Sequence, residues 1–141
     1  MDQLIEFIGN NTLMVIAFVA VTGMLIVSEI NRATRGYKEL STAEAVRLIN
    51  NEDAAVVDVS NADSFRKAHI AGAWNLPLNQ LKNPGADIEK LKQRPIIVVC
   101  KTGNTAHQAA AGLLKQGFAS VSLLRGGMSQ WIADHLPVKT S

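Results

Sequence analysis

The sequence of 141 residues contains a single cysteine, Cys100, so it cannot form an internal disulfide bond. One cysteine also gives no sign of an oxidising compartment, where disulfides are common. No group of His, Cys and carboxylate residues has metal-ligand spacing, and we predict neither a metal nor another cofactor. The net charge is only +2, and no basic run is interleaved with aromatic residues, so nucleic acid is not a predicted partner.

Charged residues are absent from residues 7–28, the most apolar part of the chain. As a helix, these 22 residues would rise about 33 Å, close to the hydrocarbon thickness of a bilayer. A cleaved signal peptide is one alternative, but Asp2 and Glu6 stand where a positive segment would be expected. A buried core helix is another, which the apolar character on all sides argues against. We therefore predict that residues 1–30 are an N-terminal anchor that crosses a membrane through residues 7–28.

Basic residues flank only one end of this span. Arg32, Arg35 and Lys38 follow it, and no Lys or Arg precedes it. Positive charge close to the end of a membrane helix favours the cytoplasmic side. The sequence therefore predicts that the N-terminus lies outside and that the rest of the chain lies in the cytoplasm. Residues 31–38 are predicted to be a short juxtamembrane linker.

About 100 residues remain after the span, enough for one small domain with a single core. A capping box at Ser41 and Glu44 predicts the start of a helix, and Gly117 predicts the end of another. Predicted strands occupy residues 54–59, 73–78, 96–99 and 120–124, and predicted helices occupy residues 41–49, 63–68, 88–91, 105–115 and a last segment around Trp131. This alternation predicts an α/β fold with a mainly parallel sheet covered on both faces.

Cys100 directly follows the strand predicted at residues 96–99, and a helix is predicted from Thr105 onward. In parallel sheets, ligands bind beyond the carboxyl ends of the strands. A tight loop entering a helix directs backbone N–H groups inward, and the helix N-terminus adds partial positive charge. Such a loop would favour the thiolate over the thiol and give a nucleophile, with Lys101 adding charge and Gly103 permitting the turn. From position alone, the alternative is a buried cysteine that merely ends a strand.

Three groups of residues resemble the signatures of the rhodanese family, in the same order along the chain. They are Val56-Val57-Asp58-Val59 with Phe65 and the run from His69 to Pro77; Ile97-Val98-Val99-Cys100-Lys101-Thr102-Gly103; and Leu124-Arg125-Gly126-Gly127-Met128 with Trp131 and Leu136-Pro137-Val138. The resemblance covers residues 39–138 and leaves residues 139–141 as a tail. It implies a rhodanese-like fold, with a five-stranded parallel sheet flanked by helices. With its N-terminal span, the chain is similar to membrane-anchored single-domain rhodaneses of the bacterial inner membrane.

The resemblance also implies a sulfurtransferase reaction with Cys100 as the catalytic residue. The cysteine would take a sulfur from a small anionic donor such as thiosulfate, and a thiol or cyanide would then accept it from the persulfide. The substrate-binding loop would comprise Lys101, Thr102, Gly103, Asn104 and Thr105. Asp58 would support this loop by accepting backbone N–H bonds, the alternative being a plain strand-end residue. Arg125 would approach the site to bind anions.

Two positions depart from the family pattern. Many members have Arg or Lys at the sixth loop position, where this chain has Thr105, and many have Arg where it has Ser60. A hydroxyl group still donates a hydrogen bond but lacks the charge, so we predict modest affinity for thiosulfate. Of the histidines, His69 is predicted to be structural and His107, in the first turn of the helix after Cys100, to be exposed.

Two other functions compete with sulfur transfer. A rhodanese-fold domain could instead be an interaction module for a membrane protein, with incidental or no catalysis. Phosphatases on the same fold resemble Cys-x5-Arg, but Ala106 stands at the position of that arginine. The sequence therefore predicts a rhodanese-type sulfurtransferase first and an interaction module second, and a membrane-protein partner is compatible with both.

Overall fold

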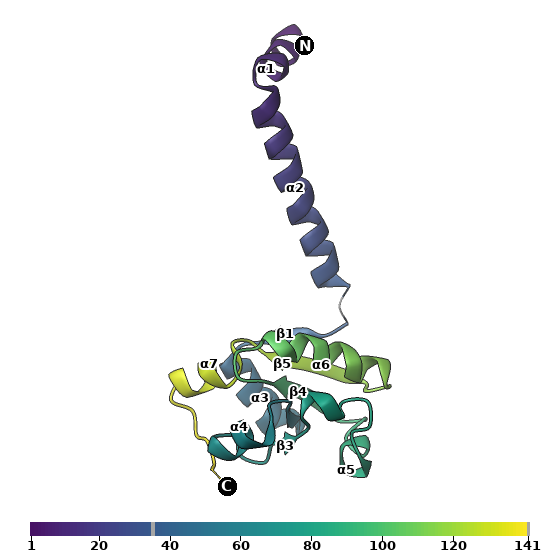
Figure 1. Cartoon of the computed structure of the whole chain (residues 1–141), viewed down its shortest axis with the longest axis vertical. Helices are drawn as coiled ribbons and strands as arrows, with labels where there is room; N and C mark the ends of the chain where they lie inside the picture. The colour runs from purple at the N-terminus through teal and green to yellow at the C-terminus, as the bar shows by residue number, and fades with distance from the viewer. Residues whose placement is uncertain (35, 141) are drawn as a thin grey trace. The chain divides into compact units, whose positions relative to one another are not determined.

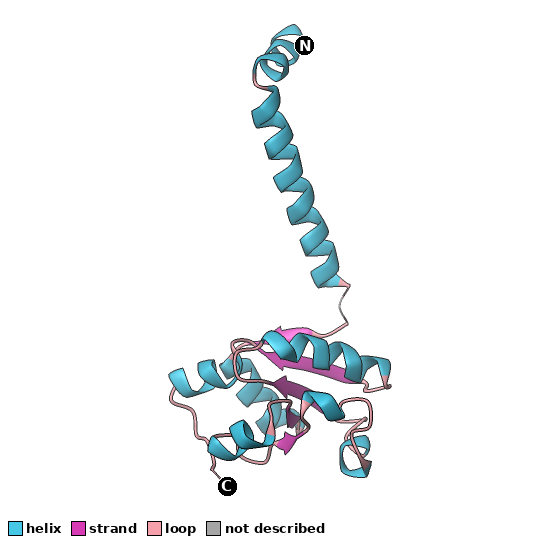
Figure 2. Cartoon of the chain, viewed as in Figure 1, coloured by secondary structure: helices cyan, strands magenta, loops and turns pink. Residues whose placement is uncertain are grey.

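The computed structural model describes residues 1–34 and 36–140, and Figure 1 shows the course of the chain. Contacts divide the chain into two compact units, Met1–Arg35 and Gly36–Ser141. The first unit is helical, and the second contains a parallel sheet with helices packed against it (Figure 2).

Two helices form the N-terminal unit, α1 (Asp2–Asn10) and α2 (Thr12–Ala33). The prediction of one continuous helix through residues 7–28 is wrong, because the helix breaks at Asn11. Asparagine is a weak helix former, since its side chain competes for backbone hydrogen bonds. Here the Asn11 amide donates to Phe7 O, and the Thr12 hydroxyl donates to carbonyls of the preceding turn.

The second of these helices is long and apolar enough to cross a membrane over Thr12–Asn31. Its large apolar side chains, among them Phe18 and Met24, are exposed in the described structure. Arg35, one of the basic residues behind the predicted orientation, lies outside the described residues.

Five strands form one parallel sheet in the second unit. In spatial order they are β1 (Lys38–Leu40), β5 (Ser120–Leu124), β4 (Pro95–Val99), β2 (Ala55–Asp58) and β3 (Trp74–Asn75). The middle strand is β4, whose Val98 is paired with Val57 on one side and Leu123 on the other. Most of its residues are buried, as expected for a parallel sheet covered by helices on both faces. The predicted α/β fold with a five-stranded parallel sheet is confirmed.

The remaining helices are α3 (Thr42–Glu52), α4 (Ala62–Lys67), α5 (Ala86–Glu89), α6 (Asn104–Lys115) and α7 (Gly127–Ala133), with a 3-10 helix at Leu78–Gln80. The predicted capping box opens α3: Ser41 Oγ accepts from the Glu44 N–H at 3.2 Å, and the Glu44 carboxylate accepts from the Ser41 N–H at 3.0 Å. Gly117 follows α6 with a φ of 95°, the left-handed conformation that ends many helices.

Alternate residues along β4 point to opposite faces of the sheet and belong to two separate cores. Ile96 and Val98 face a core that includes residues of α5 and α6, and Cys100 continues this side. Ile97 and Val99 face a second core that includes residues of α3 and α7. The loop after β4 therefore begins with a side chain that faces α6.

Two strands differ from the expectation based on residue pattern. The strand predicted at residues 73–78 is only Trp74–Asn75, because Pro77 cannot donate to a ladder and the chain turns into the 3-10 helix after it. The short strand β1 is not apparent from the residue pattern, since three residues that are at most half-buried give too weak a signal. It begins at Lys38, within the segment predicted as a linker, and pairs with β5.

The capping box at the start of α3 gives a direct test of local stability. Ser41→Ala removes the acceptor of the Glu44 N–H, so we expect the free energy of unfolding to fall by about 1 kcal/mol in urea titrations of residues 36–141. Ser120→Ala is the control, because the Ser120 side chain is exposed. Equal stability of the two variants would contradict the contribution assigned to the cap.

Candidate active site

Cys100 lies directly after β4 at the carboxyl edge of the sheet, where Asp58 also ends β2. In the pairing of these two strands, Asp58 lies opposite Val99. Cys100 is 2% exposed and belongs to the core that includes α6. The sequence predicted the position of Cys100 at the strand end, and the structure adds that its side chain is packed inward.

The Cys100 sulfur accepts a main-chain hydrogen bond from the loop that follows it. The Gly103 N–H donates to Cys100 Sγ over 2.8 Å. Gly103 has a φ of 95° and immediately precedes α6, so the chain turns back toward the sulfur before the helix begins. A donor at this distance stabilises an anionic sulfur more than a neutral one. Of the several inward N–H groups that we predicted, this is the one that bonds to the sulfur among the described residues.

The Cys100 loop is held by the start of α7, which follows β5. The Met128 N–H donates to Cys100 O over 2.8 Å. Ser129 donates twice to Lys101 O, from its N–H over 3.0 Å and from its hydroxyl over 2.9 Å. The two backbone donors belong to the first turn of α7, where N–H groups have no partner within the helix. The free N–H groups at the start of α7 and two carbonyl groups of the Cys100 loop are therefore each other's hydrogen-bond partners.

Gly127, the first residue of α7, allows the helix start to approach the Cys100 loop. A Cβ atom at Gly127 would lie 2.1 Å from Cys100 O and 2.9 Å from Gly103 N, which are both main-chain atoms. Any other residue at this position must therefore displace the Cys100 loop. The sequence pattern pointed to Gly126 and Gly127 only as part of a family signature. Two successive glycines, one residue beyond a strand, are the local signal of such a close approach.

The other predicted loop residues lie at the surface of this site. Exposed side chains belong to Lys101, Thr102, Asn104 and Thr105, whereas Gly103 is buried. Thr105 lies in the first turn of α6, whose N-terminus has no side-chain cap. Uncapped N–H groups at a helix N-terminus favour the binding of an anion. The structure therefore places the Thr105 hydroxyl and these N–H groups at the same end of α6.

Asp58 is a buried carboxyl group at the end of β2, only 1% exposed. Its Oδ1 accepts from the Ser60 N–H over 2.9 Å and also from the Ser60 hydroxyl, whereas its Oδ2 has no partner among the described residues. Burial raises the pKa of Asp58 above its ordinary value of 3.8, although the Ser60 bonds and nearby His69 act in the opposite direction. The described bonds hold the Ser60 turn and include none to the Cys100 loop.

Arg125 follows β5 and contacts β1. Its Nε lies 3.5 Å from Glu39 Oε2, and His107 Nε2 lies 3.6 Å from Glu39 Oε1. The Tyr37 hydroxyl lies 3.1 Å from His107 Nδ1. His107, which we predicted to be exposed, is therefore half-buried in a network that joins β1 to the first turn of α6. The anion-binding role of Arg125 stays a prediction, since its described contact is with Glu39.

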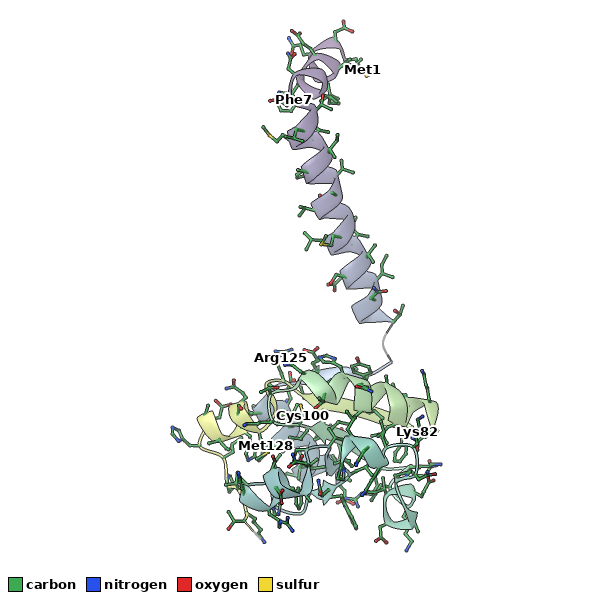
Figure 3. All side chains as sticks on the ribbon, in the orientation of Figure 1. Met1, Phe7, Lys82, Cys100, Arg125 and Met128 are labelled. Atoms are coloured by element: carbon green, nitrogen blue, oxygen red, sulfur yellow. The ribbon has the colours of Figure 1, made fainter. Side chains whose placement is uncertain are left out.

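A cavity of about 190 Å³ lies beside the Cys100 loop. It is lined by residues of the Ser60 turn, α4, the Cys100 loop and α7, namely Ser60, Ser64, Lys67, Ala68, Lys101, Met128 and Ile132. Lys101 is joined to Cys100 by a peptide bond and Met128 by a hydrogen bond, so the cavity adjoins the cysteine. Figure 3 shows Cys100 and Met128 close together, with Lys82 at the other end of the domain. Lys67 was not predicted, because an exposed lysine on a helix carries no local signal of a cavity.

His69 lies outside this cavity and has structural contacts. Its Nδ1 lies 2.7 Å from Phe65 O, and its ring stacks on that of Phe65. Main-chain hydrogen bonds also tie His69 to Lys139 near the C-terminus. These contacts agree with the structural role predicted for His69. Within the part of the chain that the structure describes, no group of three or more His, Cys, Asp or Glu side chains could hold a metal ion.

Residues 41–134 match the family model described as a rhodanese-like domain. The chain belongs to this family. This rhodanese-like protein is 38% identical to YibN of Escherichia coli (strain K12) over 139 residues, which cover 98% of this chain and 97% of YibN. It is also 34% identical to the thiosulfate sulfurtransferase GlpE of Coxiella burnetii (strain RSA 493 / Nine Mile phase I). That alignment has 99 residues and covers 70% of this chain and 91% of GlpE.

Solved structures have the same fold as this rhodanese-like domain. A rhodanese-related protein from Thermoplasma volcanium superposes with a TM-score of 0.65 at 24% identity, covering 74% of this chain and 100% of that one. A rhodanese-like domain from Anabaena has a TM-score of 0.55 at 30% identity, covering 60% of this chain and 97% of that one. The rhodanese-like fold implied by the sequence is therefore confirmed.

The close approach at Gly127 can be tested against its neighbour. Gly127→Ala places a Cβ against main-chain atoms of the Cys100 loop, whereas Gly126→Ala meets only the Gln130 side chain. Both glycines have positive φ, so the backbone strain is similar in the two variants. We expect G127A to lose about 1–3 kcal/mol more unfolding free energy than G126A in urea titrations, because of overpacking. Equal losses would contradict the close approach.

The buried Asp58 carboxyl predicts a specific pH dependence of stability. Its folded-state pKa is raised, so the folded protein binds this proton more tightly than the unfolded chain, and stability falls as the pH rises through the folded-state pKa. The amide in Asp58→Asn does not titrate. We therefore expect the stability of D58N relative to wild type to increase as the pH rises above about 4, the ordinary pKa of an aspartate.

Urea titrations at several pH values measure this difference. Asp87→Asn is the matched control, because the Asp87 side chain is exposed. The difference in stability between D58N and wild type could prove independent of pH, or Asp87→Asn could give the same pH dependence. Either result would show that burial of the Asp58 carboxyl does not cause the effect.

Proposed function

We propose that this rhodanese-like chain is a sulfurtransferase that carries sulfane sulfur on Cys100. A donor similar to thiosulfate supplies the sulfur, and a thiol or cyanide accepts it. The likeness to a thiosulfate sulfurtransferase supports this activity. The observation that carries the proposal is the Gly103 N–H bond to Cys100 Sγ, because a donor already directed at the sulfur stabilises its anionic forms.

The first half-reaction transfers one sulfur atom to the cysteine. The Cys100 thiolate attacks the outer sulfur of thiosulfate, a new S–S bond forms, and the S–S bond of the donor breaks. Sulfite leaves with the electron pair of that bond, and a persulfide remains on Cys100. The total charge of donor and thiolate equals that of sulfite and persulfide, so no oxidant or reductant is required.

The second half-reaction regenerates the cysteine. An acceptor thiolate or cyanide attacks the outer persulfide sulfur, and the bond to Cys100 Sγ breaks with its electron pair returning to Sγ. The sulfur leaves as an acceptor persulfide or as thiocyanate. Because the donor product leaves before the acceptor reacts, this scheme predicts ping-pong kinetics.

The residues around the loop have separate roles in this proposal. The Gly103 N–H and the uncapped start of α6 stabilise negative charge on the donor and on the persulfide. Lys101 adds an exposed positive charge next to Cys100. Thr105 offers a hydroxyl without a charge, which weakens the attraction for thiosulfate.

The burial of Cys100 supports a second candidate function. A cysteine that is 2% exposed and packed in a core can act simply as a small hydrophobe. In this second function the domain is an interaction module for a membrane protein, and sulfur transfer is incidental or absent. Cys100→Ser separates the two functions, since it abolishes the first and leaves the second intact.

We further propose that the chain is a single-pass protein of the bacterial inner membrane, anchored by α2. The N-terminus then lies outside and the rhodanese-like domain in the cytoplasm, because the basic residues Arg32, Arg35 and Lys38 follow the apolar segment and none precedes it. The alignment with YibN extends through this segment, which supports the combination of an apolar helix with the domain.

Substitutions at Cys100 and Thr105 test the reaction in residues 36–141. Cys100→Ala removes the attacking sulfur, so we expect no thiocyanate above background from thiosulfate and cyanide, and no added sulfur by mass spectrometry. Thr105→Arg adds a charge at the exposed start of α6, and we expect the KM for thiosulfate to fall about fivefold.

Thiocyanate formation by the Cys100→Ala variant would rule out Cys100 as the sulfur carrier. An unchanged KM in Thr105→Arg would contradict the effect assigned to position 105. Wild-type protein that gains no sulfur after incubation with thiosulfate would favour the interaction module.

A further inference from the structure

The cavity beside the Cys100 loop is positively charged. Two lysines, Lys67 and Lys101, are among its lining residues, together with Ser60 and Ser64. The Ser60 hydroxyl donates to Asp58, whereas no hydrogen bond of the Ser64 hydroxyl is described. Among the described residues, no acidic side chain lines it, and neither lysine forms an ion pair. Such a lining is suited to an anionic group of a small molecule.

We propose that this cavity selects the sulfur acceptor, and that the acceptor is a small aliphatic thiol that carries a carboxylate. Lys67 and Lys101 hold the carboxylate while the thiolate reaches the persulfide on Cys100. This inference rests on the proposed sulfurtransferase function and specifies which class of thiol receives the sulfur.

The position of Lys67 distinguishes the acceptor from the donor. In thiosulfate, the sulfonate group is bonded directly to the sulfur that is transferred, so the whole donor lies at the Cys100 loop during the first half-reaction. Lys67 belongs to α4, and the cavity extends from the loop to that helix. The Lys67 ammonium group on α4 is therefore suited to bind an acceptor carboxylate that lies several bonds away from the reacting sulfur. Thiosulfate and cyanide have no group at that distance.

The size and apolar part of the cavity narrow the acceptor further. Its volume of about 190 Å³ is below the range of about 300–1,000 Å³ typical of pockets for drug-sized ligands. Ala68, Met128 and Ile132 form an apolar wall that can contact a short carbon chain. The attraction between an ammonium group and a nearby carboxylate persists at the protein surface. The Ser64 hydroxyl can donate a hydrogen bond to the same carboxylate oxygens.

Met128 connects this wall to the reacting residue, because its N–H donates to Cys100 O over 2.8 Å. In the transfer step, the acceptor thiolate attacks the outer sulfur of the Cys100 persulfide. The S–S bond to Cys100 breaks, its electron pair returns to Sγ, and the acceptor leaves as its own persulfide.

The test measures persulfide discharge by the full chain in detergent. Protein is loaded with thiosulfate, freed of excess donor and mixed with one of three thiols. Mercaptosuccinate carries negative charge in addition to its thiol, 2-mercaptoethanol is neutral, and cysteamine carries a positive charge. Wild type is compared with Lys67→Met and Lys67→Glu. Lys82→Met is the matched control, because Lys82 is exposed and lies at the other end of the domain (Figure 3).

The readout is the ratio of the second-order rate constant for discharge by mercaptosuccinate to that for 2-mercaptoethanol. We expect this ratio to fall about three- to fivefold in Lys67→Met and to keep its wild-type value in Lys82→Met. Lys67→Glu should shift the preference toward cysteamine. Comparing each ratio with wild type cancels both the basicity of the thiols and any loss of overall rate.

An unchanged ratio in both Lys67 variants, or an equal change in Lys82→Met, would overturn the inference while leaving the sulfurtransferase function in place. Sulfite release and persulfide mass during loading test that function before any acceptor is added. Failure of the wild type to form a persulfide would overturn both the function and the acceptor selection that rests on it.

Discussion

The Cys100 loop depends on the close approach of Gly127, where a Cβ would overlap the Cys100 carbonyl. This approach lets Met128 and Ser129 donate to Cys100 O and Lys101 O, so two successive carbonyls of the loop are fixed by α7. The following turn then brings the Gly103 N–H to the sulfur. The chemistry proposed for Cys100 therefore depends on a main-chain contact with a segment far along the chain.

Features of the fold with a local signal were predictable from the sequence. The capping box at Ser41, the helix end at Gly117 and the strand before Cys100 are each specified within a few residues, and the structure contains all three. The edge strand β1 has no such signal, because it is stabilised by pairing with β5 rather than by its own residues. Only the family resemblance implied a fifth strand. The break at Asn11 was missed because charge and hydropathy, not helix propensity, defined the apolar segment.

At the site, the position of Cys100 was predictable and its surroundings were not. A strand followed by a glycine-containing turn and a helix places the cysteine at the carboxyl edge of a parallel sheet. Its burial follows from which face of β4 it continues, and that is decided by packing against α6. Lys67 illustrates the same limit, since a lysine at the end of a short helix has the same sequence pattern whether it borders open solvent or a cavity. The cavity is lined by three segments that are distant in sequence, residues 60–68, the Cys100 loop and α7.

Cys100 lies where the two cores of the domain meet at the edge of the sheet. Its side chain belongs to the core that includes α6, whereas Met128, which bonds to its carbonyl, belongs to the core on the other face and lines the cavity. The sulfur is thus shielded on the α6 side, and the two lysines that line the cavity are Lys67 and Lys101. In the proposed reaction, an anionic substrate meets these positive groups before it reaches the sulfur. The residues that attract the anionic substrate at the cavity therefore differ from Gly103, whose N–H stabilises the sulfur. A substitution can alter the binding of the substrate without altering the hydrogen bond to the sulfur.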